Sequence, residues 1–366
     1  MSVVPSLADA TARRADNVLP LRHLAAWLVI YGHSFPLGNN AAGAVDVVER
    51  WLPGYSASRC AVFLFFAISG YLLTNSLLRH PGVLRYAWHR VLRIYPAYLA
   101  CLLLCVLVLG AWFTTWPLGE YFRSPDTWEH LRHNLIPTSF IWSLPGVFEG
   151  NPYPDVVNGS LWSLGLEVRW YFWLGVLAAL GVVRRRGVFT VVVGAWLLYT
   201  AWQVLDGVPD PLGYRALAQT FLLGALAAQW ARHLRPSHLW MLAAWVLPWL
   251  GWATGRLDLV MPLAAVLLTL WLAYRVPALP WPGGRDYSYG IFLYGFPVQQ
   301  ALMASWPELP PSALCAASTL LVLPFALASW HLLEQPALRW KRGAPGGAEV
   351  VVRPAAPAHA DVSGER

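Results

Sequence analysis

The sequence is poor in charge. Only 12% of its 366 residues are Asp, Glu, Lys or Arg, whereas 57% are hydrophobic. A water-soluble domain carries about 25% charged residues, so this composition excludes an ordinary soluble domain and indicates a chain that crosses a membrane several times. The formal net charge of +7 does not point to a nucleic-acid partner, because basic residues in a membrane protein first mark the loops that stay in the cytoplasm.

Cysteine is scarce as well. Cys60, Cys101, Cys105 and Cys315 lie in or beside apolar runs and lack the spacing of metal ligands. We therefore expect small buried side chains at these positions and no metal site.

The two ends of the chain are polar. Residues 1–17 lack the apolar segment of a cleavable signal peptide, so we expect a polar cytoplasmic N-terminus followed by a first span that serves as its own insertion signal. Residues 341–366 have the composition of a disordered cytoplasmic tail.

Between these ends the sequence contains ten apolar runs of nearly twenty residues, the length needed to cross a bilayer. Their centres lie near residues 27, 69, 104, 171, 197, 222, 246, 266, 297 and 322. The sequence therefore predicts an all-α, polytopic membrane protein with about ten transmembrane helices, folded as one domain over residues 18–340.

Basic residues are distributed unevenly between the predicted loops. With a cytoplasmic N-terminus, eighteen Lys and Arg residues fall on the inner side and six on the outer side. This bias predicts that both termini are cytoplasmic. The long outer connection, residues 114–160, is rich in Pro, Trp and acidic residues. A loop of this length is usually functional or disordered, and its aromatic residues could stack on sugar rings or lie at the membrane surface.

The stretch LAAWLVIYGHSFPL, residues 24–37, places His33 deep inside an apolar run that follows Arg22. Eleven residues of helix rise about 16 Å, so Arg22 at the inner mouth puts His33 past the middle of the membrane. Polar side chains at that depth are costly and often functional. His33 is thus a candidate general base, and the alternative is a hydrogen bond between two helices.

The fourth predicted span begins with NGSLWSLGLEVRWYFW, residues 158–173. Ser163 and Glu167 are four residues apart and share one helix face. A carboxylate beside His33 would raise its basicity and fix its tautomer, so we expect Glu167 to orient His33. The alternative is a structural Glu167 that pairs with a neighbouring helix or with Arg169, although Arg169 lies about 200° away around the helix.

Arg90 and Arg93 are three residues apart at the predicted cytoplasmic end of the third span. Two guanidiniums on one face can grip phosphate groups. Arginines at this level also serve as topology signals or contact lipid headgroups.

Six segments carry a family pattern in one order: Arg22 with His33, AVFLFFAISGYLLTNS (61–76), HRVLRIYPAY (89–98), GSLWSLGLE (159–167), DYSYGIFLYGFPVQQ (286–300) and HLLEQP (331–336). With these segments the chain resembles the acyltransferase-3 family of integral membrane acyltransferases, which includes O-antigen, exopolysaccharide, Nod-factor and macrolide acylases. The resemblance runs from about residue 18 to 340. Phe63, Val168 and Gly295 stand where many relatives have Asp, Glu and His, so any mechanism that needs a second histidine in the ninth span fails here.

The resemblance implies transfer of an acyl group, usually acetyl, from cytoplasmic acyl-CoA to a saccharide or glycolipid hydroxyl on the outer side of a bacterial cell membrane. It makes His33 the expected base, and Arg22, Arg90 and Arg93 the expected ligands of the CoA phosphates. Four further residues are expected to shape the tunnel or to stabilise the oxyanion: Ser69, Trp162, Ser163 and Tyr294. Glu334, in the closing motif, is expected to be a structural polar residue.

Two other functions remain possible from the residues. A transporter or flippase of lipid-linked saccharides would use the polar groups as a conduction path. A purely structural membrane subunit would leave the intramembrane charges without a joint explanation.

Overall fold

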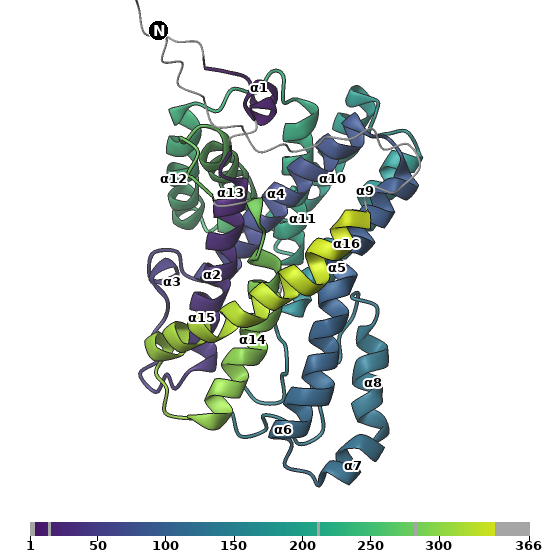
Figure 1. The fold of residues 1–366 in the computed structure, drawn as a ribbon. Coiled ribbons are helices and arrows are strands. Elements are labelled where there is room, and N and C mark those ends of the chain that lie inside the picture. Colours follow the sequence, from purple (N-terminus) through teal and green to yellow (C-terminus); the bar gives the residue numbers. More distant parts are fainter. Residues whose placement is uncertain (1–3, 14–15, 211–212, 282–283, 341–366) are drawn as a thin grey trace, which may run out of the picture.

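The computed structural model describes residues 4–13, 16–210, 213–281 and 284–340, and within these ranges the chain is helical and has no β-strand (Figure 1). In chain order the helices are α1 (Leu7–Ala12), α2 (Val18–Leu37), α3 (Val47–Trp51), α4 (Ala57–Arg79), α5 (Val83–Leu104), η1 (Cys105–Gly110), α6 (Ala111–Phe113), α7 (Leu118–Arg123), α8 (Pro125–Asn134), α9 (Leu161–Ala179), α10 (Arg186–Leu205), α11 (Tyr214–Gln229), α12 (His238–Ala253), α13 (Leu257–Tyr274), α14 (Ser288–Ser305), α15 (Pro311–Ala328), η3 (Ser329–Glu334) and α16 (Gln335–Arg339). The predicted all-α class is therefore confirmed for the described residues.

Each of the ten predicted span centres lies in a helix. Five described helical segments are long and apolar enough to cross a membrane: Ala57–Arg79, Val83–Phe113, Arg186–Leu205, Leu257–Tyr274 and Pro311–Arg339. Of the others, α11 and α12 have only 16 residues each, while α2, α9 and α14 carry polar residues in their apolar runs. Ten spans and the sides of the termini remain predictions, and the predicted tail, residues 341–366, lies outside the described residues.

Helix α4 lies at the centre of the bundle, where it packs against α2, α11 and α13 (Figure 1). Its contact with α11 depends on two glycines. A Cβ atom on Gly70 would lie 2.0 Å from the carbonyl oxygen of Phe221, and one on Gly224 would lie 2.6 Å from that of Ala67. The two backbones therefore touch, as membrane helices do where small residues face each other.

The connection over residues 114–160 is packed against the bundle. It contains α7 and α8 at the end of the molecule where α6 also lies (Figure 1). Asn151 donates to the carbonyl oxygen of Gln300 over 2.9 Å, and Asn158 donates to that of Leu293 over 2.9 Å. Both contacts join the connection to α14, so its last part has a fixed position beside the helices that line the site.

The N-terminal segment is not wholly a polar tail, because it contains the short helix α1. Ser6 and Asp9 form a capping box at its start. Leu7 is fully buried, and its amide donates to the carbonyl oxygen of Leu234 over 2.7 Å. This part of the N-terminus is thereby docked on the segment that follows α11.

The four cysteines are free, and all but the half-buried Cys60 are buried. The described residues contain no group of three or more His, Cys, Asp or Glu side chains that could hold a metal ion.

Candidate active site

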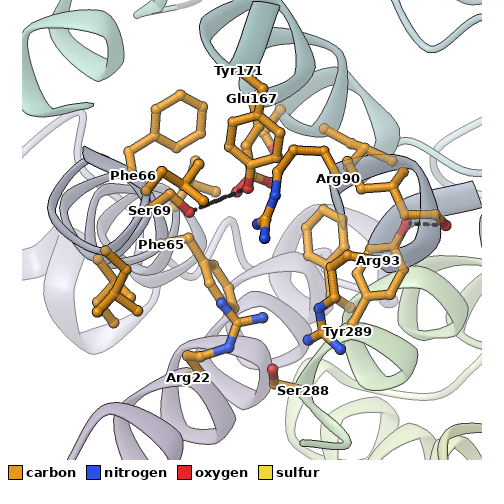
Figure 2. A pocket seen from close by; sticks show the side chains of 18 of the residues that line it. Arg22, Phe65, Phe66, Ser69, Arg90, Arg93, Glu167, Tyr171, Ser288 and Tyr289 are labelled. Atoms are coloured by element: carbon orange, nitrogen blue, oxygen red, sulfur yellow. Dashed lines mark hydrogen bonds between the residues drawn. The ribbon is translucent and has the colours of Figure 1, made fainter. Parts of the chain in front are cut away.

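A cavity of about 220 Å³ lies among α2, α4, α5, α9 and α14, and the three predicted phosphate-binding arginines line it together (Figure 2). We call it the arginine cavity. Its lining residues include Arg22, Arg90, Arg93, Ser69, Glu167, Tyr171, Ser288 and Tyr289, with apolar walls from α4 and α5. The sequence predicted that Arg22, Arg90 and Arg93 act together. The fold brings all three, from α2 and α5, to one cavity.

Arg22 and Arg93 are already paired with carboxylates. Both contact Oδ2 of Asp286, from Arg22 Nε over 3.1 Å and from Arg93 Nη2 over 2.6 Å. Arg93 Nη1 also lies 3.1 Å from Oε2 of Glu334, a residue that is 1% exposed and accepts a hydrogen bond from Ser329. Arg22 and Arg93 therefore have a structural role as ion-pair partners, which their spacing in the sequence did not reveal.

Asp286 is the residue that sequence reasoning missed. It precedes α14 and is the first residue of the family motif DYSYGIFLYGFPVQQ. The resemblance gives this carboxylate no role. Burial alone would raise the pKa of this carboxyl, but the guanidiniums of Arg22 and Arg93 outweigh burial and hold the pKa well below its usual range. The carboxylate is therefore ionised at neutral pH and neutralises part of the charge of the arginine pair.

Replacing Asp286 with Asn is expected to lower the free energy of unfolding by about 3 kcal/mol, because it leaves two partly buried guanidiniums facing each other without their shared counter-ion. The pKa of Asp286 is depressed in the folded state. The stability that its carboxylate gives to the wild type should therefore be fully present above the ordinary Asp pKa of about 4, and it should fade as the pH falls below that value. Thermal unfolding of the purified protein in detergent at several pH values measures this effect. Asp206→Asn, a change at an exposed carboxylate, is the control, and equal stability of both variants at pH 7 would contradict the assignment.

Arg90 differs from the other two arginines. Within the described ranges no carboxylate lies at ion-pair distance from it, and its buried Nε has no hydrogen-bond partner there. Its guanidinium lies over two aromatic rings instead, 5.8 Å from the centroid of Tyr171 and 6.0 Å from that of Tyr86. Figure 2 shows it pointing into the cavity opposite Arg22 and Arg93. Arg90 is consequently the cation best able to accept an anionic ligand.

Glu167 lies in the arginine cavity and not beside His33. It accepts hydrogen bonds from Ser69 Oγ over 2.7 Å and from the hydroxyl of Tyr171 (Figure 2). The expectation that Glu167 orients His33 is therefore wrong. Four residues of α9 separate it from Ser163 by about 6 Å along the helix axis, which is enough to carry the carboxylate out of reach. Arg169 is not its partner either, because Arg169 donates to the carbonyl oxygen of Thr138.

His33 lines a second cavity of about 310 Å³, which we call the histidine cavity. Its wall consists of Val29, His33, Ser56, Ser58, Arg59, Val62, Tyr153, Ser160, Trp162, Ser163 and Phe292. A Cβ atom on Gly32 would lie 2.4 Å from the backbone nitrogen of Ser58, so the helix turn that carries His33 is pressed against the start of α4. The position of the imidazole is thereby fixed by backbone contact.

The imidazole of His33 makes no hydrogen bond through Nδ1 within the described residues. Its Nδ1 is buried and has no partner among the described residues, and its ring meets the edge of Phe296 with 5.4 Å between centroids. The alternative of a helix-to-helix hydrogen bond at Nδ1 is therefore not observed. A buried polar atom without a partner is costly, and a ligand in the cavity could satisfy it.

Ser160 is a second unpartnered polar residue in this cavity, and the sequence analysis overlooked it. It is 1% exposed, and its Oγ has no hydrogen-bond partner in the described part of the chain. A serine at the first position of a helix normally caps the backbone, yet the helical backbone angles of Ser160 leave its hydroxyl out of the cap. In the sequence, Ser160, the first serine of SLWSL, therefore looks like an ordinary helix-capping residue.

The two cavities are neighbours and share part of their walls. Val62 from α4, Ser163 from α9 and Phe292 from α14 line both of them, and we call these three residues the neck. Arginines thus lie on one side of the neck and the histidine on the other. A ligand with an anionic end in the arginine cavity could present its other end near His33.

The remaining predicted residues are divided between these places. Ser69 lines the arginine cavity and Trp162 lines the histidine cavity, where its ring stacks on Tyr214 at 5.9 Å. Tyr294 lines neither cavity; it packs against Phe325 on another face of α14. The expected role of Tyr294 in the tunnel is therefore wrong, because its position on the helix turns it away.

A family model described as an acyltransferase domain, Acyl_transf_3, matches residues 21–331. An O-acetyl transferase of Shigella phage Sf6 is 26% identical over 338 residues, which cover 86% of this chain and 93% of that protein. Nodulation protein 10 of Rhizobium leguminosarum bv. viciae is 27% identical over 372 residues, covering 92% and 96%. No solved structure gives a significant match.

Proposed function

The chain is an O-acyltransferase of the acyltransferase-3 family, and we propose that it carries an acyl group from acyl-CoA through the neck to a saccharide hydroxyl held in the histidine cavity. The observation that carries this proposal is that the two cavities are neighbours and share the wall residues Val62, Ser163 and Phe292. One cavity offers cations for phosphates, and the other offers an imidazole whose Nδ1 has no hydrogen-bond partner within the described residues.

The donor binds with its phosphates near Arg90 in this proposal. A phosphate diester or monoester gains charge-assisted hydrogen bonds from a guanidinium, and no carboxylate in the described part of the chain forms an ion pair with Arg90. Arg22 and Arg93 add positive potential but stay fixed by Asp286. Glu167 with the hydroxyl of Ser69 forms a polar wall for the amides of the pantetheine arm.

The chemical step is a direct transfer. The acceptor hydroxyl oxygen attacks the thioester carbonyl carbon while His33 removes its proton. A C–O bond forms and the C–S bond breaks, and the proton passes from His33 to the departing sulfur, which gives an ester and free CoA thiol. The unpartnered hydroxyl of Ser160 is available to hold the acceptor, and Ser163 at the neck can donate to the carbonyl oxygen as it becomes negative.

The acceptor is a saccharide or a lipid-linked glycan. The Shigella phage relative is named an O-acetyl transferase, which supports acetyl as the acyl group. Tyr153 and Trp162 supply aromatic faces in the histidine cavity, and such faces pack well against the apolar face of a sugar ring. We place the protein in a bacterial cell membrane, with acyl-CoA entering from the cytoplasm, and no observation favours the transporter alternative.

A comparison of surface and secreted glycans by mass spectrometry, with and without the gene, tests this proposal. We expect the strain without the gene to lose one acyl increment on a saccharide and to regain it from a plasmid copy. An unchanged glycan acylation pattern, with a defect only in glycan export, would contradict acyl transfer.

A further inference from the structure

A recess of about 500 Å³ lies outside the active site and shares no lining residue with the arginine cavity or the histidine cavity. Three arginines line it: Arg79 at the end of α4, Arg186 at the start of α10 and Arg232 just after α11. We call it the basic recess. The proposed acyl transfer gives these arginines no role.

The positive charge of the basic recess is not compensated within the described part of the chain. None of the described residues that line it is an Asp or Glu, and none of its three arginines forms an ion pair in the described ranges. Arg186 lies over the ring of Trp230, 4.4 Å from its centroid, a contact that positions the guanidinium but supplies no negative charge. Like charges gathered at one site repel each other, so the recess favours an anionic ligand.

The basic recess lies at the ends of helices that can cross a membrane. Arg79 is the last residue of the candidate span Ala57–Arg79, and Arg186 is the first residue of the candidate span Arg186–Leu205. Only 17% of the apolar stretch of this second span is buried in the protein, so most of α10 faces outward. Trp230 ends α11 beside Arg186, and tryptophan is typical of the boundary between hydrocarbon and water. The anions of a membrane at this level are the phosphates of lipid headgroups.

The segments around the basic recess are tied to one another by backbone groups. The amide of Ala8 donates to the carbonyl oxygen of Ala231 over 3.0 Å, and both residues line the recess, so α1 closes one of its sides. Gln229, another lining residue, donates through Nε2 to the carbonyl oxygen of Val183 over 2.6 Å, which joins the end of α11 to the turn before α10. The segments that carry the arginines are therefore held together before any ligand binds.

From this charge, position and connection we infer that the basic recess binds the headgroup of an anionic phospholipid from the surrounding bilayer. The phosphate oxygens accept charge-assisted hydrogen bonds from the guanidiniums of Arg79, Arg186 and Arg232, while the acyl chains of the lipid extend into the hydrocarbon beside the bundle. A ligand that binds only the folded state stabilises it, so the bound lipid stabilises the packing of α1, α4, α10 and α11. This inference does not depend on the proposed acyl transfer.

Thermal unfolding of the full-length protein in detergent tests the inference, with dioleoyl phosphatidylglycerol as the anionic probe and dioleoyl phosphatidylcholine as the zwitterionic one. We expect phosphatidylglycerol to raise the melting temperature of the wild type well above the value in phosphatidylcholine. An arginine near an anionic lipid contributes about fivefold in affinity. The double variant Arg79→Gln/Arg232→Gln should therefore need roughly 25-fold more phosphatidylglycerol for half of the shift, and Arg79→Gln alone about fivefold more.

The matched control is the double variant Arg184→Gln/Arg185→Gln. It removes the same charge from exposed arginines in the turn before α10, which do not line the recess, so its half-maximal concentration should equal that of the wild type. Equal weakening in the two double variants would indicate general attraction to a basic surface and would overturn the inference. An equal response of the wild type to both lipids would overturn it as well, whether or not the variants fold.

Free phosphate is the other source of the same chemistry. Inorganic phosphate, at the concentration of phosphatidylglycerol that gives the full shift, should leave the melting temperature of the wild type unchanged. If inorganic phosphate raised the melting temperature as much as the lipid did, the recess would be a site for a soluble anion and the lipid assignment would be wrong.

Discussion

Replacing His33 with Ala is expected to abolish acyl transfer while the protein stays folded and still binds acyl-CoA. General-base catalysis by a positioned side chain contributes about 10²- to 10⁴-fold, so we expect kcat to fall by about 10³-fold. The donor lies on the far side of the neck in our proposal, so its affinity should change little. Initial rates with labelled acetyl-CoA, together with donor-binding titrations, measure both effects.

The control for this substitution is His238→Ala, at an exposed histidine on α12. It should keep normal rates. Normal turnover in His33→Ala would exclude the mechanism. Trapping of a labelled acyl group on the wild-type protein without acceptor would instead favour an acyl-histidine intermediate over the direct transfer.

Replacing Arg90 with Ala is the second large effect, and we expect it to raise the KM for acyl-CoA while leaving the fold intact. A hydrogen bond to a charged group contributes about 1.5 to 3 kcal/mol, which corresponds to an increase of roughly 10- to 100-fold. Arg90→Lys should recover part of the loss, since it keeps the charge but not the bidentate geometry. Steady-state kinetics over a range of acyl-CoA concentrations measure the KM.

Arg93→Ala provides the matched comparison for Arg90→Ala. Arg93 is an ion-pair partner of both Asp286 and Glu334. Its removal leaves the buried Glu334 without an ion-pair partner among the described residues and Asp286 with Arg22 alone, so it should lower the melting temperature strongly. An unchanged KM in Arg90→Ala, or an elevated KM without loss of stability in Arg93→Ala, would reverse the roles that we assign to the two arginines.

The sequence predicted the features that depend on the residue pattern of a single helix. The apolar runs located ten helices, and the spacings of Arg22 with His33 and of Arg90 with Arg93 placed the right side chains at the cavities. Such patterns depend only on helix geometry and on the cost of polar groups in an apolar environment. They are therefore accessible without a structure.

The sequence could not predict how helices are rotated against one another. The hydrogen bond from Ser69 to Glu167, the position of Asp286 between two arginines and the packing of Tyr294 against Phe325 are all set by contacts between distant segments. Spacing along α9 showed that Ser163 and Glu167 share a face, but it could not show that Ser163 lines both cavities whereas Glu167 lines only the arginine cavity. Family resemblance did not help here either, because it gives residues and not their partners.

The backbone contact between Gly70 and Phe221 has a consequence for biosynthesis. The two residues belong to α4 and α11, which leave the ribosome far apart in time. The walls that α4 gives to both cavities lack their contact with α11 until this later helix has been synthesised. A nascent chain that ends before α11 already contains His33 and the three arginines, but it lacks both the contact of α11 with α4 and the walls that α14 gives to the cavities.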